Sequence, residues 1–385
     1  MSVDTHVTAV GEVCAVVAAH AEQTDRTAVF PAEALAAMRR TGLLGLLVPD
    51  EFGGGGGGPS DLVDVTMALG RVDLSVAMIF AMHSQQVAAI AGFGRGEFHA
   101  DLLRRVARGE AYLASVTTEH GKGGHLLSSE SAVRLAKGML HVDRVAPVVT
   151  GGTVADGFLI TTLAPGATSP HQVDLVYAAR DQLEITVLGD WNPVGMRATE
   201  SVALRLVGSV PEDQAIGVRG DFRSIVTALF VPLAHLGWSA AWLGAAAGAL
   251  SRVVRHIRGA DGRKQFDHTS ELLLVRLAGV RARLDAVHGL LRHTLTVVEA
   301  GGDLSAPATQ LLINALKVRA ADECFAAVHE LVELTGMRHG YLVGSTMFLE
   351  RSFRDLRSAS LNYSNDRLML VNGSLALLDS GARLA

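Results

Sequence analysis

Cysteine is scarce in this 385-residue chain, which contains only Cys14 and Cys324. The two thiols lie far apart in the sequence, so the chain lacks the disulfide framework that is typical of small secreted domains. No CxxC motif and no close cluster of cysteine and histidine is present, and we therefore expect no metal site. Such sparing use of cysteine fits a reducing compartment, and we expect a cytoplasmic protein with two structural thiols.

Blocks of like charge are also missing. The formal net charge is −5, and acidic and basic residues do not form runs, so we expect neither a nucleic-acid partner nor a membrane-surface partner. The first residues lack a basic start and an apolar core, so we expect no signal peptide. Residues 227–250 could span a bilayer by length. Pro232 and His235 within this stretch, and Arg252 and Arg255 after it, favour a buried helix instead.

The hydrophobic pattern divides the chain into three parts. Hydrophobic residues make up 49% of the chain, which is too many for a disordered protein and enough for two or three structural units. Residues 1–110 and 218–385 show helical spacing, whereas residues 111–217 alternate with the period of β-strands. We therefore predict an α+β fold with a helical N-terminal domain, a central β domain and a C-terminal antiparallel helical bundle.

Several local signals refine this outline. Six consecutive glycines, Gly53 to Gly58, predict a flexible surface loop after an extended stretch. Apolar residues from Leu273 to Leu295 recur at spacings of three and four, which places them on one helix face. Ser305 is expected to cap the next helix, and Asp366 the last one. Strands are expected at residues 140–142, 158–162, 173–177 and 202–206.

The most distinctive stretch of the central domain runs from Ala111 to Gly152. A short apolar run ends there in Thr117 and Thr118, and a second run ends in Thr150, with glycine-rich turns after both. Hydroxyl groups supply hydrogen bonds, and glycines let a ligand approach the backbone closely. The stretch therefore suggests a cradle for a flat cofactor that carries phosphate. Ordinary strand chemistry is the alternative explanation of the threonines.

Six segments in order resemble motifs of the acyl-CoA dehydrogenase superfamily. They are FPAEALAAMRRTGLLGLLVPDEFGG (30–54), TTEHGKGG (117–124), TGGTVAD (150–156), GMRATES (195–201), RKQF (263–266) and RSFRD (351–355). Each motif is weak alone, but their order and spacing agree over nearly the whole chain. The resemblance implies the fold of that superfamily, in which a central β-barrel domain lies between an N-terminal helical domain and a C-terminal four-helix bundle.

The resemblance also implies FAD as the cofactor. The cofactor-binding positions that it assigns in the central domain are Ser115, Thr117, Thr118, Gly123, Gly124, Val148 and Thr150. In the C-terminal domain they are Arg263, Gln265, Phe266 and Asn365. The Arg-x-x-Phe turn contacts the diphosphate and adenine side of the cofactor across a subunit contact in this family, and a guanidinium group suits a diphosphate. Without the resemblance, Arg263 would be taken for a solvated loop cation.

The chain departs from the dehydrogenases at the catalytic base. Most members place a glutamate eight residues after the Arg-Asp pair, and here that position is Tyr363. Other members use a glutamate at the start of a bundle helix, which corresponds to the neighbourhood of His235. Neither position carries a carboxylate, and an acyl-CoA dehydrogenase needs a base that reaches the α-proton.

A flavin site without this base resembles the flavin-dependent monooxygenase branch of the superfamily. That branch includes the dibenzothiophene monooxygenase type, the amino-sugar N-oxygenases and the indole hydroxylase of bacterial indolosesquiterpene (xiamycin) biosynthesis. The resemblance implies that reduced FAD forms a flavin C4a-hydroperoxide with dioxygen and hydroxylates a small hydrophobic aromatic or heteroaromatic substrate. The candidate catalytic residues are His83, Asn362, Tyr363 and His235. The alternatives are a core histidine for His83, packing for Tyr363 and a helix cap for Asn362.

Two other functions stay open from the sequence. One is an acyl-CoA or acyl-carrier-protein dehydrogenase whose displaced base is Glu333 or Glu119. The other is a non-catalytic flavoprotein or assembly subunit. No GxGxxG follows a predicted strand, so the reduced flavin would come from a separate flavin reductase. The family forms homotetramers, and we expect a homotetramer or a homodimer.

Overall fold

A computed structural model describes residues 3–121, 125–379, 381–382 and 384. The chain folds into two compact units. The first unit comprises residues 1–62, 79–192 and 198–234, and the second comprises residues 63–78, 193–197 and 235–385. Each unit is therefore assembled from separate segments, whereas the sequence predicted three consecutive domains.

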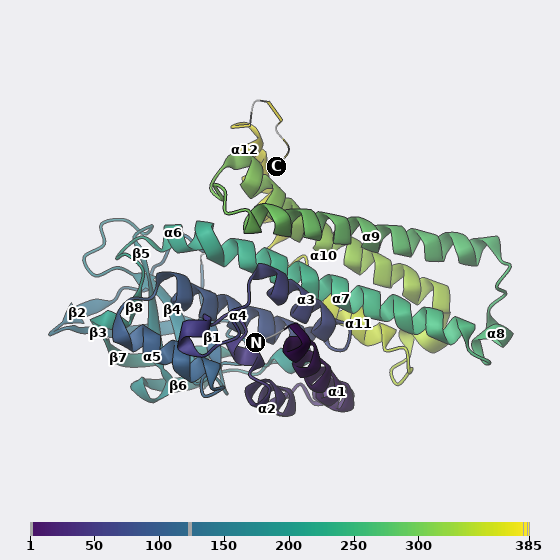
Figure 1. Cartoon of the computed structure of the whole chain (residues 1–385), viewed down its shortest axis with the longest axis horizontal. Coiled ribbons are helices and arrows are strands. Elements are labelled where there is room, and N and C mark those ends of the chain that lie inside the picture. The colour runs from purple at the N-terminus through teal and green to yellow at the C-terminus, as the bar shows by residue number, and fades with distance from the viewer. Residues whose placement is uncertain (1–2, 122–124, 380, 383, 385) are drawn as a thin grey trace. The chain divides into compact units, whose positions relative to one another are not determined.

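The helices of the first unit precede and follow its strands (Figure 1). They are α1 (Val3–Thr27), α2 (Ala32–Arg40), the 3-10 turns η1 (Leu43–Gly45) and η2 (Asp50–Phe52), most of α4 (Leu74–Phe93), α5 (Gly96–Ala107) and α6 (Phe222–Ile225). The two 3-10 turns lie where the sequence predicted an extended stretch. The left-handed backbone of Gly42, with a φ of 73°, ends α2 and starts the first of these turns.

The glycine run is packed, and the prediction of a flexible loop is wrong. The backbone N–H groups of Gly55, Gly56 and Gly57 donate to the carbonyl oxygens of Gly45, Val48 and Leu46, each at 2.9 Å. A Cβ atom at Gly54 would lie 2.2 Å from the Val48 oxygen. The absence of side chains therefore lets two backbone segments lie against each other and pair.

The strands of the first unit form two four-stranded sheets. One has the order β1 (Leu113–Val116), β4 (Gly157–Leu163), β5 (Val173–Ala179) and β8 (Ala215–Ile216). The other has the order β2 (Arg134–Ala136), β3 (Met139–Ala146), β7 (Ala203–Pro211) and β6 (Leu183–Leu188). Only the β1–β4 pair is parallel among these ladders. The four predicted strand regions all fall within or overlap β3, β4, β5 and β7.

The second unit is helical. Its main helices are most of α7 (Val231–Arg258), α9 (Glu271–Glu299), α10 (Pro307–Gly336), α11 (Leu349–Leu356) and α12 (Asn365–Ala376), with the short α8 (Gly262–Gln265) and most of α3 (Pro59–Gly70). In Figure 1, α9 and α10 run side by side as long helices, and α10 also contacts α11 and α12. The predicted seam on α9 is confirmed, because six of its seven apolar residues are buried and Leu277 is half-buried.

Two predicted helix caps are one or two residues out of place. Ala306, and not Ser305, is the N-cap of α10, and Pro307 occupies its first turn. Ser364, and not Asp366, is the N-cap of α12. Helix ends are set by the backbone conformation of the cap residue, which a single polar residue in the sequence indicates only approximately.

Two helical stretches are long and apolar enough to span a membrane, namely 74–93 and 222–258. In the apolar 18-residue window of each stretch, 83% and 67% of the residues respectively are buried within the structure. Close packing of α7 on α3 explains part of this burial, because a Cβ atom at Gly244 would lie 2.3 Å from the Met67 oxygen. The apolar composition of residues 227–250 therefore reflects packing inside the protein, as predicted.

Truncating the α9 seam should destabilise the second unit. Leu291 is fully buried, so Leu291→Ala should lower the free energy of unfolding by about 2–5 kcal/mol. Leu274 on the same helix is 52% exposed, and Leu274→Ala should change the free energy by no more than about 0.5 kcal/mol. Urea unfolding followed by circular dichroism measures both. Equal losses in the two variants would contradict the observed orientation of α9.

Candidate functional site

The loops that follow β1 and β3 form the predicted cradle in the first unit. The Thr118 hydroxyl donates to the Val148 carbonyl at 3.1 Å, which holds the two loops together. The Thr150 and Ser201 hydroxyls lie 2.9 Å apart and share a hydrogen bond. Gly123 and Gly124 lie outside the described residues.

Three side chains of this cradle are candidates for contact with a ligand, and Ser115 among them is only 8% exposed. Within the described part of the chain, the hydroxyls of Ser115 and Thr117 make no hydrogen bond, and Val148 is 43% exposed. A polar cofactor edge could therefore receive hydrogen bonds from two hydroxyls beside an apolar surface. This chemistry fits a flavin ring, which has polar atoms on one edge and an apolar benzenoid end.

A buried ion pair anchors the first of these loops. Arg144 on β3 has no exposed side-chain surface, and it forms a salt bridge with Glu119, whose side chain is 5% exposed. Arg144 also donates to the Thr118 carbonyl at 2.8 Å and to the Ser131 hydroxyl at 2.7 Å. Burial lowers the pKa of Arg144, and the neighbouring Glu119 opposes that shift.

Glu119 is therefore committed to structure. Its carboxylate also accepts hydrogen bonds from the Ser129 hydroxyl at 2.6 Å and from the Glu130 N–H at 2.9 Å. A base must offer its oxygen to a substrate proton, and these oxygens already have partners. Glu333, the other carboxylate considered for that role, lies on an exposed position of α10.

His83 is buried on α4, and both of its ring nitrogens contact the backbone. The Leu113 N–H donates to Nδ1 at 3.0 Å. Nε2 lies 3.0 Å from the Leu44 oxygen and must donate to it, so the ring is a neutral Nε2–H tautomer. Burial lowers the pKa of His83 to about 4. This geometry favours a structural role that joins α4, η1 and β1, and it leaves no nitrogen free for a substrate.

Two of the other predicted catalytic residues, His235 and Tyr363, lie together in the second unit. Their ring centroids are 6.3 Å apart, and Asn362 is the neighbour of Tyr363 in the loop between α11 and α12. His235 Nδ1 lies 3.2 Å from the Ile313 carbonyl, so Nδ1 carries the proton and Nε2 is an acceptor. Burial and then Lys317 lower the pKa of His235 to about 3. Burial raises the pKa of Tyr363, which keeps its hydroxyl protonated.

Lys317 of α10 is the functional candidate that the sequence analysis missed. Its side chain is fully buried, and its Nζ lies 5.4 Å from the centroid of the Trp242 ring. Burial lowers the pKa of Lys317 to about 7, partly opposed by Asp322. The helical periodicity of the sequence could have identified Lys317 as buried, because it follows Ile313 by four residues and precedes Ala320 and Cys324 by three and seven. It thus occupies the apolar stripe of α10.

The sequence pattern of β3 could likewise have identified Arg144 as a buried residue. Leu140, Val142, Arg144 and Ala146 alternate along the strand and are all buried. An arginine in the inward phase of an alternating strand requires a buried partner, and Glu119 is that partner.

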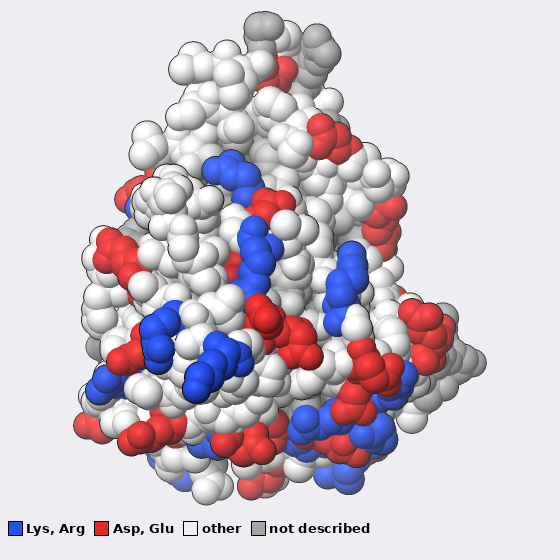
Figure 2. All heavy atoms as spheres, turned by 90° about the vertical axis from the view of Figure 1, so that its left-hand side faces the viewer, with Lys and Arg blue, Asp and Glu red and all other residues white. Residues whose placement is uncertain are grey.

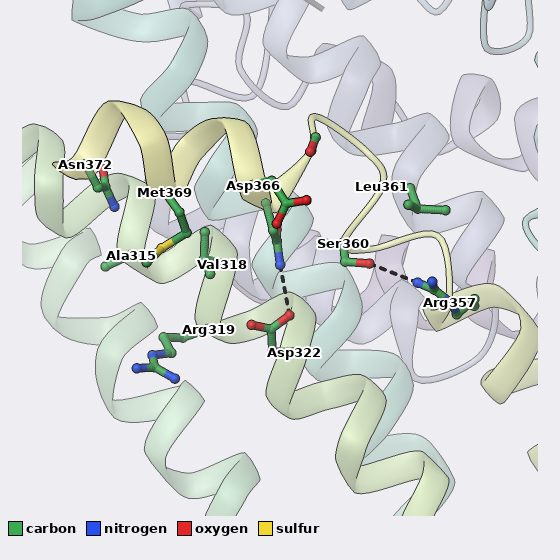
Figure 3. A pocket seen from close by; sticks show the side chains of 12 residues that line it. Ala315, Val318, Arg319, Asp322, Arg357, Ser360, Leu361, Asp366, Met369 and Asn372 are labelled. Carbon is green, nitrogen blue, oxygen red and sulfur yellow. Dashed lines mark hydrogen bonds between the residues drawn. The ribbon is translucent and has the colours of Figure 1, made fainter. Parts of the chain in front are cut away.

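Asn365 has a different environment from the one expected of a cofactor ligand. Its amide nitrogen donates to Asp322 at 2.9 Å, and its amide oxygen accepts from Lys317 at 2.8 Å. Both ends of the side chain therefore serve the protein itself. Figure 3 shows the first of these bonds beside a pocket of about 570 Å³ between α10, α12 and the loop before α12. Arg319, Arg357 and Asp366 line it, so its mixed charges do not suit a small hydrophobic substrate.

The predicted diphosphate turn lies at the other end of the second unit. Arg263 is exposed, and its Nε donates to the Arg258 carbonyl at 3.1 Å. Among the described residues its terminal nitrogens have no hydrogen-bond partner, so they could bind an anion. Gln265 contacts His339 at 3.3 Å, and the Phe266 ring stands edge-on to His256. A pocket of about 650 Å³ beside the turn is lined by four arginines, namely Arg255, Arg258, Arg263 and Arg281. This lining suits a polyanion such as a diphosphate.

The distribution of charged side chains and of possible metal ligands concerns the other predicted partners. On the face drawn in Figure 2, basic and acidic side chains are interspersed, in keeping with the formal net charge of −5. Among the described residues, no group of three or more His, Cys, Asp or Glu side chains is arranged to hold a metal ion.

Comparison with known proteins establishes the family. Residues 7–110 match the acyl-CoA dehydrogenase N-terminal domain, and residues 236–364 match the acyl-CoA dehydrogenase C-terminal domain. Together these matches cover more than half of the chain. The chain therefore belongs to the acyl-CoA dehydrogenase family, as its six motifs predicted.

Relatives with different activities resemble this chain. The amino sugar nitrososynthase DnmZ of Streptomyces peucetius is 27% identical in an alignment of 348 positions, which covers 80% of this chain and 79% of DnmZ. An acyl-CoA dehydrogenase of Bacillus subtilis is 24% identical over 349 residues, which are 89% of this chain and 88% of that protein. The structure of dibenzothiophene monooxygenase TdsC from Paenibacillus sp. A11-2 with FMN and indole has a TM-score of 0.86 and 20% identity, covering 99% of this chain and 98% of TdsC. This likeness shows a shared fold.

Replacing His83 tests whether its role is structural. His83→Leu leaves the Leu44 oxygen and the Leu113 N–H buried without partners, at a cost of about 1–3 kcal/mol for each group. The folded pKa of about 4 lies below the ordinary value of 6.5. The neutral ring therefore stabilises the fold fully above pH 6.5, and that contribution is lost as the pH falls towards 4.

Urea unfolding at pH 7.5 and pH 5.0 measures both effects. The variant should be less stable at pH 7.5, and its stability should fall less between the two pH values than that of the wild type. His288→Leu on the exposed face of α9 is the control and should show neither change. A His83→Leu protein with normal stability but no turnover would instead assign His83 to the chemistry.

Proposed function

We propose that this protein is a monooxygenase that takes reduced flavin from a separate reductase and hydroxylates a small hydrophobic aromatic or heteroaromatic molecule. One observation carries the proposal. Tyr363, eight residues after Asp355, stands where most dehydrogenases of the family have their catalytic glutamate. The alternative bases also fail, because Glu119 is bound to Arg144 and Glu333 is an exposed residue of α10.

Family membership alone does not select this reaction. Relatives include the nitrososynthase and the acyl-CoA dehydrogenase described above, and also a probable FMNH2-dependent monooxygenase, SfnC of Pseudomonas putida. The neutral pair of His235 and Tyr363 favours oxygenation. Abstraction of an α-proton from a thioester needs a strong, charged base, whereas hydroxylation of an electron-rich ring needs a donor and an acceptor that keep their protons at neutral pH.

Each residue of the pair has a defined role in this proposal. Reduced flavin, when bound, would supply the two electrons that activate dioxygen. The Tyr363 hydroxyl would donate a hydrogen bond to the oxygen that is transferred, because its raised pKa keeps it protonated. His235 Nε2 would accept a hydrogen bond from the substrate, because Nδ1 donates to Ile313 and the ring stays neutral. Asn362 would supply a further polar contact from the same loop.

We propose FAD rather than FMN as the flavin. The cradle residues Ser115, Thr117 and Val148 would hold the ring, and Thr118 and Thr150 would keep the loops in place. FMN lacks the second phosphate and the adenosine that the four-arginine pocket beside Arg263 could bind. In the family this turn reaches a neighbour's cofactor, so the proposal includes a homotetramer or homodimer. The expected location is the cytoplasm.

A reconstituted reaction tests the function. The purified protein, FAD, NADH, a generic flavin reductase and indole in air should give a hydroxylated product that oxidises to blue indigo. The reductase without this protein is the control and should give none. Oxidation of an acyl thioester with a dye acceptor in the absence of dioxygen would contradict the proposal and support a dehydrogenase. Bound flavin with neither activity would support a non-catalytic flavoprotein.

Substitution of Arg263 tests the choice of flavin. Arg263→Ala removes a charge-assisted hydrogen bond worth about 1.5–3 kcal/mol, so the Kd for FAD should rise about tenfold or more. The Kd for FMN should stay the same, because FMN lacks the groups that the turn would bind. Lys264→Ala, at an exposed neighbouring position, is the control. Isothermal titration of both flavins measures the effect, and equal weakening for FAD and FMN would contradict this use of the turn.

A further inference from the structure

We propose that Lys317 is the positioning residue of the active site, which acts by fixing Tyr363. The inference rests on the roles proposed above for Tyr363 and His235. Lys317 Nζ donates to the Ala359 carbonyl at 3.0 Å, to the Tyr363 carbonyl at 3.0 Å and to the Asn365 amide oxygen at 2.8 Å. An ammonium group has three N–H donors and no acceptor, so these three partners use all of them.

The three partners bracket one short segment of the loop before α12. Ala359 lies at its start, and Asn365, the first residue of α12, closes it, so Asn362 and Tyr363 lie between them. No carboxylate of the described residues accepts a hydrogen bond directly from Lys317. The Asn365 amide lies between Lys317 and Asp322 and is hydrogen-bonded to both. Lys317 therefore forms hydrogen bonds with the loop rather than with a counter-ion, and these bonds fix both ends of the segment.

Tyr363 needs such support because its backbone is strained. Its φ is +54°, in the left-handed region that residues with a Cβ atom disfavour. Such conformations persist only where the surroundings fix them, and they concentrate at functional sites. The hydrogen bond from Lys317 falls on the carbonyl of this same residue. Loss of the bond should therefore let the segment relax and should displace the Tyr363 ring.

The same helix also fixes the partner ring. The Ile313 carbonyl, one turn before Lys317 on α10, accepts from His235 Nδ1. The Trp238 ring lies 6.0 Å from the His235 ring, centroid to centroid, at a tilt of 44°. Lys317 Nζ lies over the Trp242 ring. One turn of α10 therefore sets the positions of both His235 and Tyr363, so a change at Lys317 should alter their mutual geometry without touching either side chain.

A comparison of Lys317→Met with Arg319→Met tests the proposal. Met keeps the length of the lysine stem but removes all three donors, and Arg319 is an exposed control two residues away on α10. The first readout is hydrogen–deuterium exchange of the full-length protein and does not depend on activity. Amides of residues 359–366 should exchange at least about tenfold faster in Lys317→Met than in the wild type, while those of α9 and the control variant should not change.

The second readout separates positioning from general instability. In the reductase-coupled assay with indole, Lys317→Met should lower kcat for hydroxylation at least about tenfold with KM changed less than about threefold. Oxygen uptake should continue, with the missing product recovered as hydrogen peroxide, as in Tyr363→Phe. Lys317→Arg, which keeps the charge and donors, should recover part of the coupling. If Lys317→Met does not fold, Lys317→Arg and Asn365→Ala carry the same comparison.

The outcomes distinguish this inference from the proposed function. Unchanged exchange at residues 359–366 in a folded Lys317→Met protein would overturn the positioning role. Normal coupling and kcat in that variant, beside an active wild type, would also overturn it while leaving the monooxygenase intact. Faster exchange in the loop with a wild type that hydroxylates nothing would support the structural action of Lys317 and would reject the function.

Discussion

The burial of a cation is the physical constraint that each of the two units meets on its own. A charged group inside a protein must be paired or fully hydrogen-bonded. In this chain the partners come from the loops that carry the predicted site residues. In the first unit, Arg144 draws Glu119 and the Thr118 carbonyl into the interior. In the second, Lys317 collects acceptors from the loop that carries Tyr363. Removing either cation would free the loop that it holds.

This arrangement explains how the family fold can accommodate a different reaction. The hydroxyls of the β cradle and the arginine pocket on the bundle are retained, so the groups that would hold a flavin remain. Tyr363 replaces the expected glutamate and stands against a neutral His235. Under the proposed function, a neutral donor and acceptor would take the place of the charged base, and such a pair suits transfer of an oxygen atom better than removal of a proton.

The sequence predicted the parts of the structure that repeat and missed the parts that depend on one contact. The α9 seam and the main strands follow from periodicity, and the structure confirms them. The six motifs carry the resemblance to the family, and the comparisons confirm it. The packing of the glycine run could not be foreseen, because it depends on backbone groups of residues 45–48 that lie opposite. Likewise, the sequence could not show that the Asn365 amide, predicted to bind the cofactor, is hydrogen-bonded to Lys317 and Asp322. The sequence allowed His83 to be either a catalytic residue or a core histidine. Its two backbone hydrogen-bond partners favour the core histidine.

The origin of the oxygen atom in the product tests the central claim most directly. The reductase-coupled reaction with indole is run under ¹⁸O₂ in ordinary water, and the hydroxylated product is analysed by mass spectrometry. The account predicts one ¹⁸O atom in each product molecule, because a monooxygenase transfers one atom of dioxygen. A product that carries only oxygen from water, or that forms equally well without dioxygen, would contradict it.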